Sequence, residues 1–126
     1  MARLATVLLR HETPSGGHFD WMLATPGGSP GAGLWTVRTD LAAAAWRGAG
    51  RWRLTRIADH RRQYLAYQGP LTGGRGSVRR VDAGWVRPWL WRSDEMIFDL
   101  MMSHCRGRVR VEQADADCWT AHWLEG

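Results

Sequence analysis

The chain has 126 residues, of which 17 are basic and 12 acidic, with 44% hydrophobic and 10% aromatic residues, two Cys and a formal net charge of +5. This length suits a single domain over residues 1–126 whose core forms without disulfides. The apolar fraction excludes a disordered chain, no apolar run reaches the roughly 18 residues of a membrane span, and two Cys are too few for a disulfide scaffold.

Short runs of strand character follow one another along the chain, separated by turns rich in Gly and Pro, such as residues 26–33 and 73–76. In chain order these runs are residues 6–11, 18–23, 34–38, 52–57, 64–67, 77–81, 96–101, 108–112 and 119–124. The one helical segment is residues 40–46, with Asp40 as N-cap and Gly48 just past its end. The pattern predicts a mainly β protein, a small closed β-barrel of about eight short strands with at most one short helix.

Nine Trp residues are an unusually high number for a chain of this length. Alternation with polar neighbours predicts half-buried strand positions, most of them in the core, for Trp21, Trp35, Trp52, Trp85 and Trp119. Trp89 and Trp91 stand in an Arg-flanked segment that reads as a loop, where they could stack on bases or sugars.

The cellular compartment is suggested by the first apolar run and by the Cys residues. Residues 4–9 lack the length and the cleavage site of a secretory signal. Cys105 and Cys118 form no close-spaced pair, which favours two reduced thiols that act as small buried hydrophobic groups. We therefore expect a cytoplasmic protein, monomeric and without membrane contact.

Positive charge is concentrated in the middle of the chain. All 17 basic residues are Arg, and residues 47–80 hold nine of them against one acid. Such a segment predicts a positive surface that attracts polyanions, with nucleic acid as the first candidate. The alternative is a set of solvated strand faces without a partner.

The sharpest local pattern lies in residues 11–22. On a strand, His18, Asp20 and Met22 share one face. The intervening Pro and Gly residues suit a hairpin loop, which would place His11 opposite His18. Two imidazoles and a carboxylate would then converge as ligands for Mn²⁺, Fe²⁺ or Zn²⁺. Otherwise the two His are edge residues and Asp20 pairs with an Arg.

A second cluster begins where the strand over residues 52–57 ends. His60 follows that strand, and Tyr64 lies four residues further on. An imidazole that titrates near neutral pH can move protons, while a phenol and nearby Arg side chains can hold phosphate oxygens.

Taken together, these segments resemble a known family, the 3′-phosphoesterase domain of bacterial DNA ligase D, most closely its short stand-alone relatives. The resemblance covers roughly residues 4–84 and rests on His11, His18-Phe19-Asp20, Asp59-His60 with Tyr64, Gly69-Pro70-Leu71, the Gly-rich segment 74–78 and Asp82-Ala83-Gly84. It implies a small closed β-barrel that removes a 3′-phosphate or a 3′-terminal ribonucleoside from nucleic acid during DNA repair. The implied partners are DNA 3′ ends and a DNA ligase or polymerase.

The resemblance also implies roles for individual residues. The metal ligands would be His11, His18 and Asp20, with Mn²⁺ as the preferred ion and Zn²⁺ or another divalent ion as alternatives. His60 and Tyr64 would contact the phosphate and assist transfer. A phosphate-binding Arg of the family falls near Arg53, with Arg51 and Arg56 close enough to compete for that role.

The chain departs from the family pattern at three places. The two metal-binding His are one residue further apart, and the Gly-rich segment after Tyr64 is shorter. Met22 occupies the position of a phosphate-binding Arg, and a thioether cannot donate hydrogen bonds to phosphate, so another Arg such as Arg75 would have to substitute.

Two other functions remain open. The first is a non-catalytic module that binds nucleic-acid ends and is associated with a ligase or polymerase, with Met22 marking lost chemistry. The second is a non-haem Fe(II) oxygenase, in which His60 or His104 would be the third ligand beside His18 and Asp20.

Overall fold

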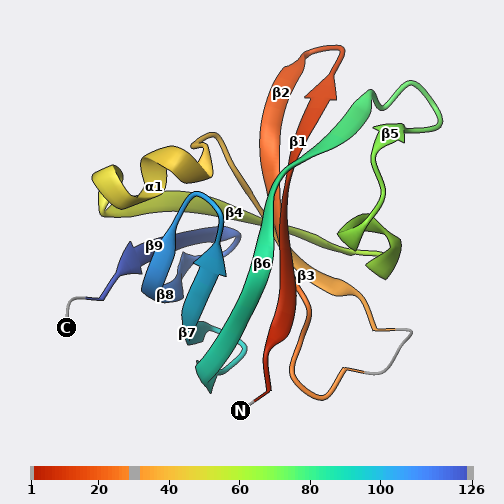
Figure 1. The fold of residues 1–126 in the computed structure, drawn as a ribbon. Helices are drawn as coiled ribbons and strands as arrows, with labels where there is room; N and C mark the ends of the chain where they lie inside the picture. The colour runs from red at the N-terminus through yellow and green to blue at the C-terminus, as the bar shows by residue number, and fades with distance from the viewer. Residues whose placement is uncertain (1, 29–31, 125–126) are drawn as a thin grey trace.

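The computed structural model describes residues 2–28 and 32–124, and these residues are mainly β (Figure 1). The elements are β1 (Leu4–Thr13), β2 (Gly16–Leu23), β3 (Leu34–Thr39), α1 (Ala43–Ala49), β4 (Arg51–His60), the 3₁₀ helix η1 (Arg62–Leu65), β5 (Gly69–Pro70), β6 (Ser77–Trp91), β7 (Glu95–Met102), β8 (Arg106–Asp115) and β9 (Cys118–Trp123). Residues 29–31 of the predicted loop 26–33 lie outside the described residues.

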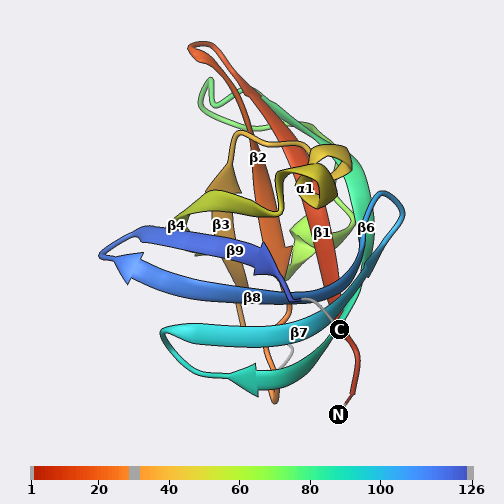
Figure 2. The same cartoon turned by 90° about the vertical axis from the view of Figure 1, so that its left-hand side faces the viewer.

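Eight strands form a closed ring of antiparallel pairs. The hydrogen-bonded order is β1-β2-β3-β4-β9-β8-β7-β6, and β6 pairs back onto β1, while the short β5 attaches to β6 outside the ring. Figure 2 shows β7, β8 and β9 running across the direction of β1 and β2. The predicted mainly β, barrel-like architecture with one short α-helix is confirmed for the described residues.

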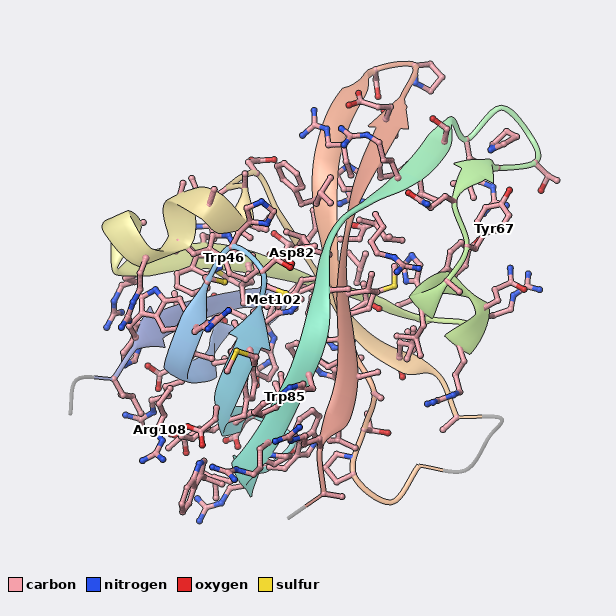
Figure 3. All side chains as sticks on the ribbon, viewed as in Figure 1. Trp46, Tyr67, Asp82, Trp85, Met102 and Arg108 are labelled. Carbon is pink, nitrogen blue, oxygen red and sulfur yellow. The ribbon has the colours of Figure 1, made fainter. Side chains whose placement is uncertain are left out.

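Alternating side chains fill the inside of the ring, as the strand periodicity predicts. Every second residue of β7 and of β9 is buried. Trp21 lies at the centre of this core, with the ring of Trp46 at 4.7 Å between centroids, and Trp46 stacks on Trp52 at 4.8 Å. The helix α1 therefore contributes to the core through Trp46, which Figure 3 labels.

The tryptophans follow most of the sequence expectations. Those at positions 21, 35, 52 and 119 are buried, and Trp85 is half-buried under the guanidinium of Arg3. The loop predicted around Trp89 and Trp91 is wrong, because β6 continues through both residues. Trp89 is 56% exposed and donates its indole N–H to Asp99, while Trp91 packs against the core.

Two further element assignments differ from the prediction. Residues 64–67 are not a strand but the end of η1 and the following turn, because Tyr64, Leu65 and Tyr67 all pack on one apolar cluster instead of alternating between two faces. The α-helix begins three residues later than predicted. Asp40 does not cap it, and the helix ends at Ala49. Gly50, and not Gly48 as predicted, is the C-cap, and its φ of 74° suits glycine.

Within the described part of the chain, none of the helices has the length and apolar character needed to cross a membrane.

Candidate metal centre

The β1–β2 hairpin sets the positions of the candidate ligands. The two strands pair without interruption up to Thr13 and Gly16, so the turn between them holds only Pro14 and Ser15. In this register His11 lies directly opposite His18, with ring centroids 4.8 Å apart. The hairpin and the facing histidines predicted from the sequence are therefore present.

The two faces of this hairpin have different neighbours. Leu8 and Trp21 point into the ring, whereas Val7, Leu9 and Met22 belong to a second apolar cluster outside it. Side chains of η1 and of the segment that follows pack over this second cluster, and Figure 1 shows η1 and β5 outside the ring near β1 and β6. The candidate metal ligands thus lie on the same face of the hairpin as this second cluster.

His11, His18 and Asp20 bring their ligand atoms within 4.8 Å of one another. His11 Nδ1 lies 3.5 Å from Asp20 Oδ2, and His18 Nε2 lies 3.2 Å from Asp20 Oδ1. The Asp20 side chain is only 2% exposed, and those of His11 and His18 are 17% and 11% exposed. These separations of 3.5 Å and 3.2 Å are similar to the spacing of ligand atoms that each lie about 2.1 Å from one divalent ion.

Two buried atoms of this cluster have no hydrogen-bond partner among the described residues. They are His18 Nε2 and Asp20 Oδ1, which face each other without the geometry of a hydrogen bond. An unpartnered buried carboxylate oxygen is costly, and an ion between the two atoms would satisfy both. The donor set of two imidazoles and one carboxylate therefore fits a divalent cation.

A backbone carbonyl fixes the orientation of His11. His11 Nε2 lies 2.8 Å from the carbonyl oxygen of Arg75, which can only accept, so Nε2 carries the hydrogen. The other ring nitrogen, Nδ1, faces Asp20 and in the neutral ring has a free lone pair. Metal-binding histidines are commonly held in this way through their second nitrogen.

His18 is also held in the form that binds metal. Burial lowers the pKa of His18, and the positive charges of Arg38 and Arg10 lower it further, while only Asp20 acts in the opposite direction. The neutral imidazole, which offers a lone pair to an ion, is therefore favoured.

A pocket of about 240 Å³ opens beside the cluster and is lined by His11 and Asp20 together with His60 and Tyr64. His60 donates its Nδ1–H to the carbonyl oxygen of Ala58 at 3.0 Å. Its ring meets the ring of Tyr64 edge-on, 5.6 Å between centroids. The structure therefore brings together two groups of predicted residues that lie about forty positions apart in the chain.

The four arginines predicted to bind phosphate occupy different places. Arg75 lines the pocket, and its guanidinium bonds Thr72. Arg56 is paired with Asp59 at 2.7 Å and lies over Trp35. Arg51 and Arg53 line a separate pocket of about 370 Å³. Because β4 is extended, at about 3.3 Å per residue, Arg53 lies some 23 Å along the strand from His60.

Two arginines near the site were not singled out from the sequence. Arg61 lines the pocket of the metal cluster, and its position directly after His60 was a usable signal. Arg38 lies opposite Asp20 in the β2–β3 register and also lines the pocket of Arg51 and Arg53. Arg38 thus lies between Asp20 of the cluster and the pocket of Arg51 and Arg53.

No protein-family model matches this chain, and no curated protein is significantly similar to it in sequence. The chemistry of the site is therefore the basis for a functional proposal.

The other histidine considered as a third ligand lies elsewhere. His104 Nδ1 is 2.9 Å from Asp82 Oδ2, and His104 lines neither the pocket beside Asp20 nor the one beside Arg53. The cluster of two histidines and one carboxylate that the structure forms includes His11 instead.

Proposed function

We propose that this protein is a metal-dependent phosphoesterase that processes the 3′ ends of nucleic acids, removing a 3′-phosphate or a 3′-terminal ribonucleoside in DNA repair. The supporting observation is that His11 and Asp20, which cluster with His18, line one pocket together with His60 and Tyr64. A ligase or a polymerase requires the 3′-hydroxyl that such a reaction leaves, so an enzyme of that kind is the proposed partner.

The three-residue cluster would hold the ion, for which Mn²⁺ is the first candidate. A divalent ion bound there would neutralise charge on a phosphate oxygen and lower the pKa of a bound water. Asp20 supplies the one negative charge of the ligand set, and the carbonyl of Arg75 holds His11 in its ligating orientation. The low exposure of the Asp20 side chain strengthens these electrostatic interactions.

The remaining residues of the pocket would handle the phosphate and its leaving group. The bond from Nδ1–H to Ala58 leaves His60 Nε2 free to exchange a proton with a substrate oxygen. The Tyr64 hydroxyl would donate a hydrogen bond to the phosphate, and its edge contact with His60 keeps the two groups together. Arg61 and Arg75 supply positive charge on the same pocket wall.

The nucleic-acid strand would continue from this pocket over β3 and β4. Arg38 borders the metal cluster through Asp20 and shares a pocket with Arg51 and Arg53. These guanidinium groups can contact successive backbone phosphates, which gives affinity without sequence preference.

Met22 favours a second candidate function, a non-catalytic module that binds nucleic-acid ends. Its side chain is 1% exposed, lines the pocket and belongs to the second apolar cluster, so it offers the phosphate no hydrogen bond. Such a module would bind DNA in a salt-sensitive way and would not turn it over.

The test is a primer–template with a 3′-phosphate, incubated with the protein and Mn²⁺. We expect a 3′-hydroxyl product from the wild type, none from His18→Ala, and unchanged activity from Asp94→Asn, which alters an exposed acid remote from the cluster. Binding without product in the wild type would instead support the end-binding module. Equal activity of wild type and His18→Ala would exclude the proposed metal-dependent reaction.

A further inference from the structure

A third pocket lies on the opposite face of the β1–β2 hairpin, at one mouth of the ring. It measures about 310 Å³ and is lined by Arg10, Phe19, Ala42, Ala43, Ala44, Arg79, Val81 and His104. Arg10 follows Leu8 on the inner face of β1, and Phe19 precedes Trp21 on the inner face of β2. Mouths of β-barrels are common places for small ligands, and this volume lies at the lower end of their usual range.

Two like charges stand directly opposite each other in this pocket. Arg10 pairs with Arg79 in the β1–β6 register, and like charges in that position repel. Glu12 bonds Arg10 Nε at 2.7 Å and is itself more than half exposed. Arg79 forms no ion pair with any described residue. An anion bound between the two side chains would offset the unpaired charge of Arg79 and accept from the N–H groups that the Glu12 bond leaves free on Arg10.

The buried carboxylate of Asp82 holds the imidazole of His104, a third polar group, at the pocket. Asp82, on β6, is labelled in Figure 3 and lies against the turn between β7 and β8. It accepts the backbone N–H groups of Ala83, Ser103 and His104 at 2.8 to 2.9 Å, and Nδ1 of the His104 ring at 2.9 Å. Its side chain is fully buried, whereas that of His104 is 52% exposed.

The consequence is a fixed imidazole at the rim of the pocket. Asp82 engages Nδ1, and His104 Nε2 makes no hydrogen bond with the described residues. When both ring nitrogens are protonated, Nδ1–H donates to Asp82 while Nε2–H remains available to an oxygen of a ligand. The apolar part of the wall comes from Phe19, Val81 and the first residues around α1.

We propose that this pocket binds a small phosphate monoester that carries an aromatic or apolar group. The phosphate lies between Arg10, Arg79 and His104. The apolar group packs on Val81 and on the alanines at the start of α1, because the guanidinium of Arg10 already lies over the ring of Phe19. This site is separate from the metal cluster, since His11 and Asp20 lie on the other face of the same hairpin and line a different pocket.

Calorimetric titration with phenyl phosphate, in the presence of EDTA, tests the proposal without any contribution from a metal ion. We expect saturable binding that is tighter than that of inorganic phosphate or of benzyl alcohol. Arg79→Gln and His104→Ala should each weaken it about tenfold, since each removes one contact to a charged group. Arg92→Gln, which alters an exposed arginine that does not line the pocket, should leave the affinity unchanged.

The histidine cluster supplies the control that separates this site from the proposed enzyme. His18→Ala should bind phenyl phosphate as the wild type does, even if no variant shows phosphoesterase activity. Absence of saturable binding at millimolar phenyl phosphate, or an unchanged affinity in Arg79→Gln, would overturn the proposal. Loss of binding in His18→Ala would place the phosphate at the metal cluster and would overturn it as well.

Discussion

Replacing Asp20 with Asn is the most direct test of the metal centre. The substitution keeps the size of a side chain that is 2% exposed, but it removes the only negative charge among the three ligands. An amide oxygen is a much weaker ligand than a carboxylate for Mn²⁺ or Zn²⁺. The variant should therefore fold and should lose the stabilisation that the ion gives to the wild type.

The size of that stabilisation follows from mass action. An ion present at 100 times its Kd, and bound only by the folded chain, adds about 2.7 kcal/mol to the free energy of unfolding. For a domain of this size the increase corresponds to a rise in Tm on the order of 10 °C. We expect this rise in the wild type when Mn²⁺ is added, and a rise below about 2 °C in Asp20→Asn.

The assay is thermal unfolding followed by tryptophan fluorescence, with and without Mn²⁺, since several Trp rings are packed in the core. Asp94→Asn, which changes an exposed carboxylate to the same amide, should retain the full rise in Tm. The metal centre is refuted if Asp20→Asn gains as much from the ion as the wild type does. It is refuted equally if neither Mn²⁺ nor Zn²⁺ raises the Tm of the wild type.

Three further predictions concern the fold. Phe98 is fully buried, so Phe98→Ala should lower the free energy of unfolding in urea by about 3–5 kcal/mol, against less than about 1 kcal/mol for the exposed Trp89→Ala. Burial raises the pKa of Cys105 to about 12, so its thiol should resist iodoacetamide at pH 8 in the folded protein and react after unfolding. Labelling of Cys105 in the folded protein would contradict this. Burial alone would raise the pKa of Asp82, but the N–H groups of His104 and Ser103 hold it below its usual value. The ionised carboxylate therefore stabilises the fold at pH values above the pKa that Asp82 has in the unfolded chain. Asp82→Asn should therefore cost about 2 kcal/mol at pH 7, and the difference should shrink as the pH falls below 4; a constant difference would exclude the charge as its cause.

Local patterns in the sequence were sufficient to predict the hairpin and the grouping of His11, His18 and Asp20. The alternation from His18 to Leu23 assigns the faces of β2, and Pro14 with its neighbours allows a tight turn. Since both signals lie within a dozen residues, the position of His11 opposite His18 could be predicted without any knowledge of the remaining strands.

Features that depend on contacts between distant segments were harder to predict. Tyr64 and Tyr67 have the composition of a strand, but the apolar cluster that they cover contains side chains from β1 and β2, so tertiary packing overrides their local preference. The continuation of β6 through Trp89 depends on pairing with β7 around an irregularity near Pro88. Arg61 follows His60 directly in the sequence, but only the fold shows that it lines the same pocket as Asp20.

The β1–β2 hairpin presents histidines on one face and an arginine on the other. This arrangement limits where residues can be inserted into the hairpin. Inserting a single amino acid into β1 just before Arg10 would invert every following position of that strand, carrying His11 toward the barrel mouth and Arg10 toward the carboxylate of Asp20. Both proposed sites would be lost in one step. A single-residue change of length in this hairpin therefore preserves the faces of both strands only at the Pro14–Ser15 tip, where an added residue leaves the alternation beneath it intact.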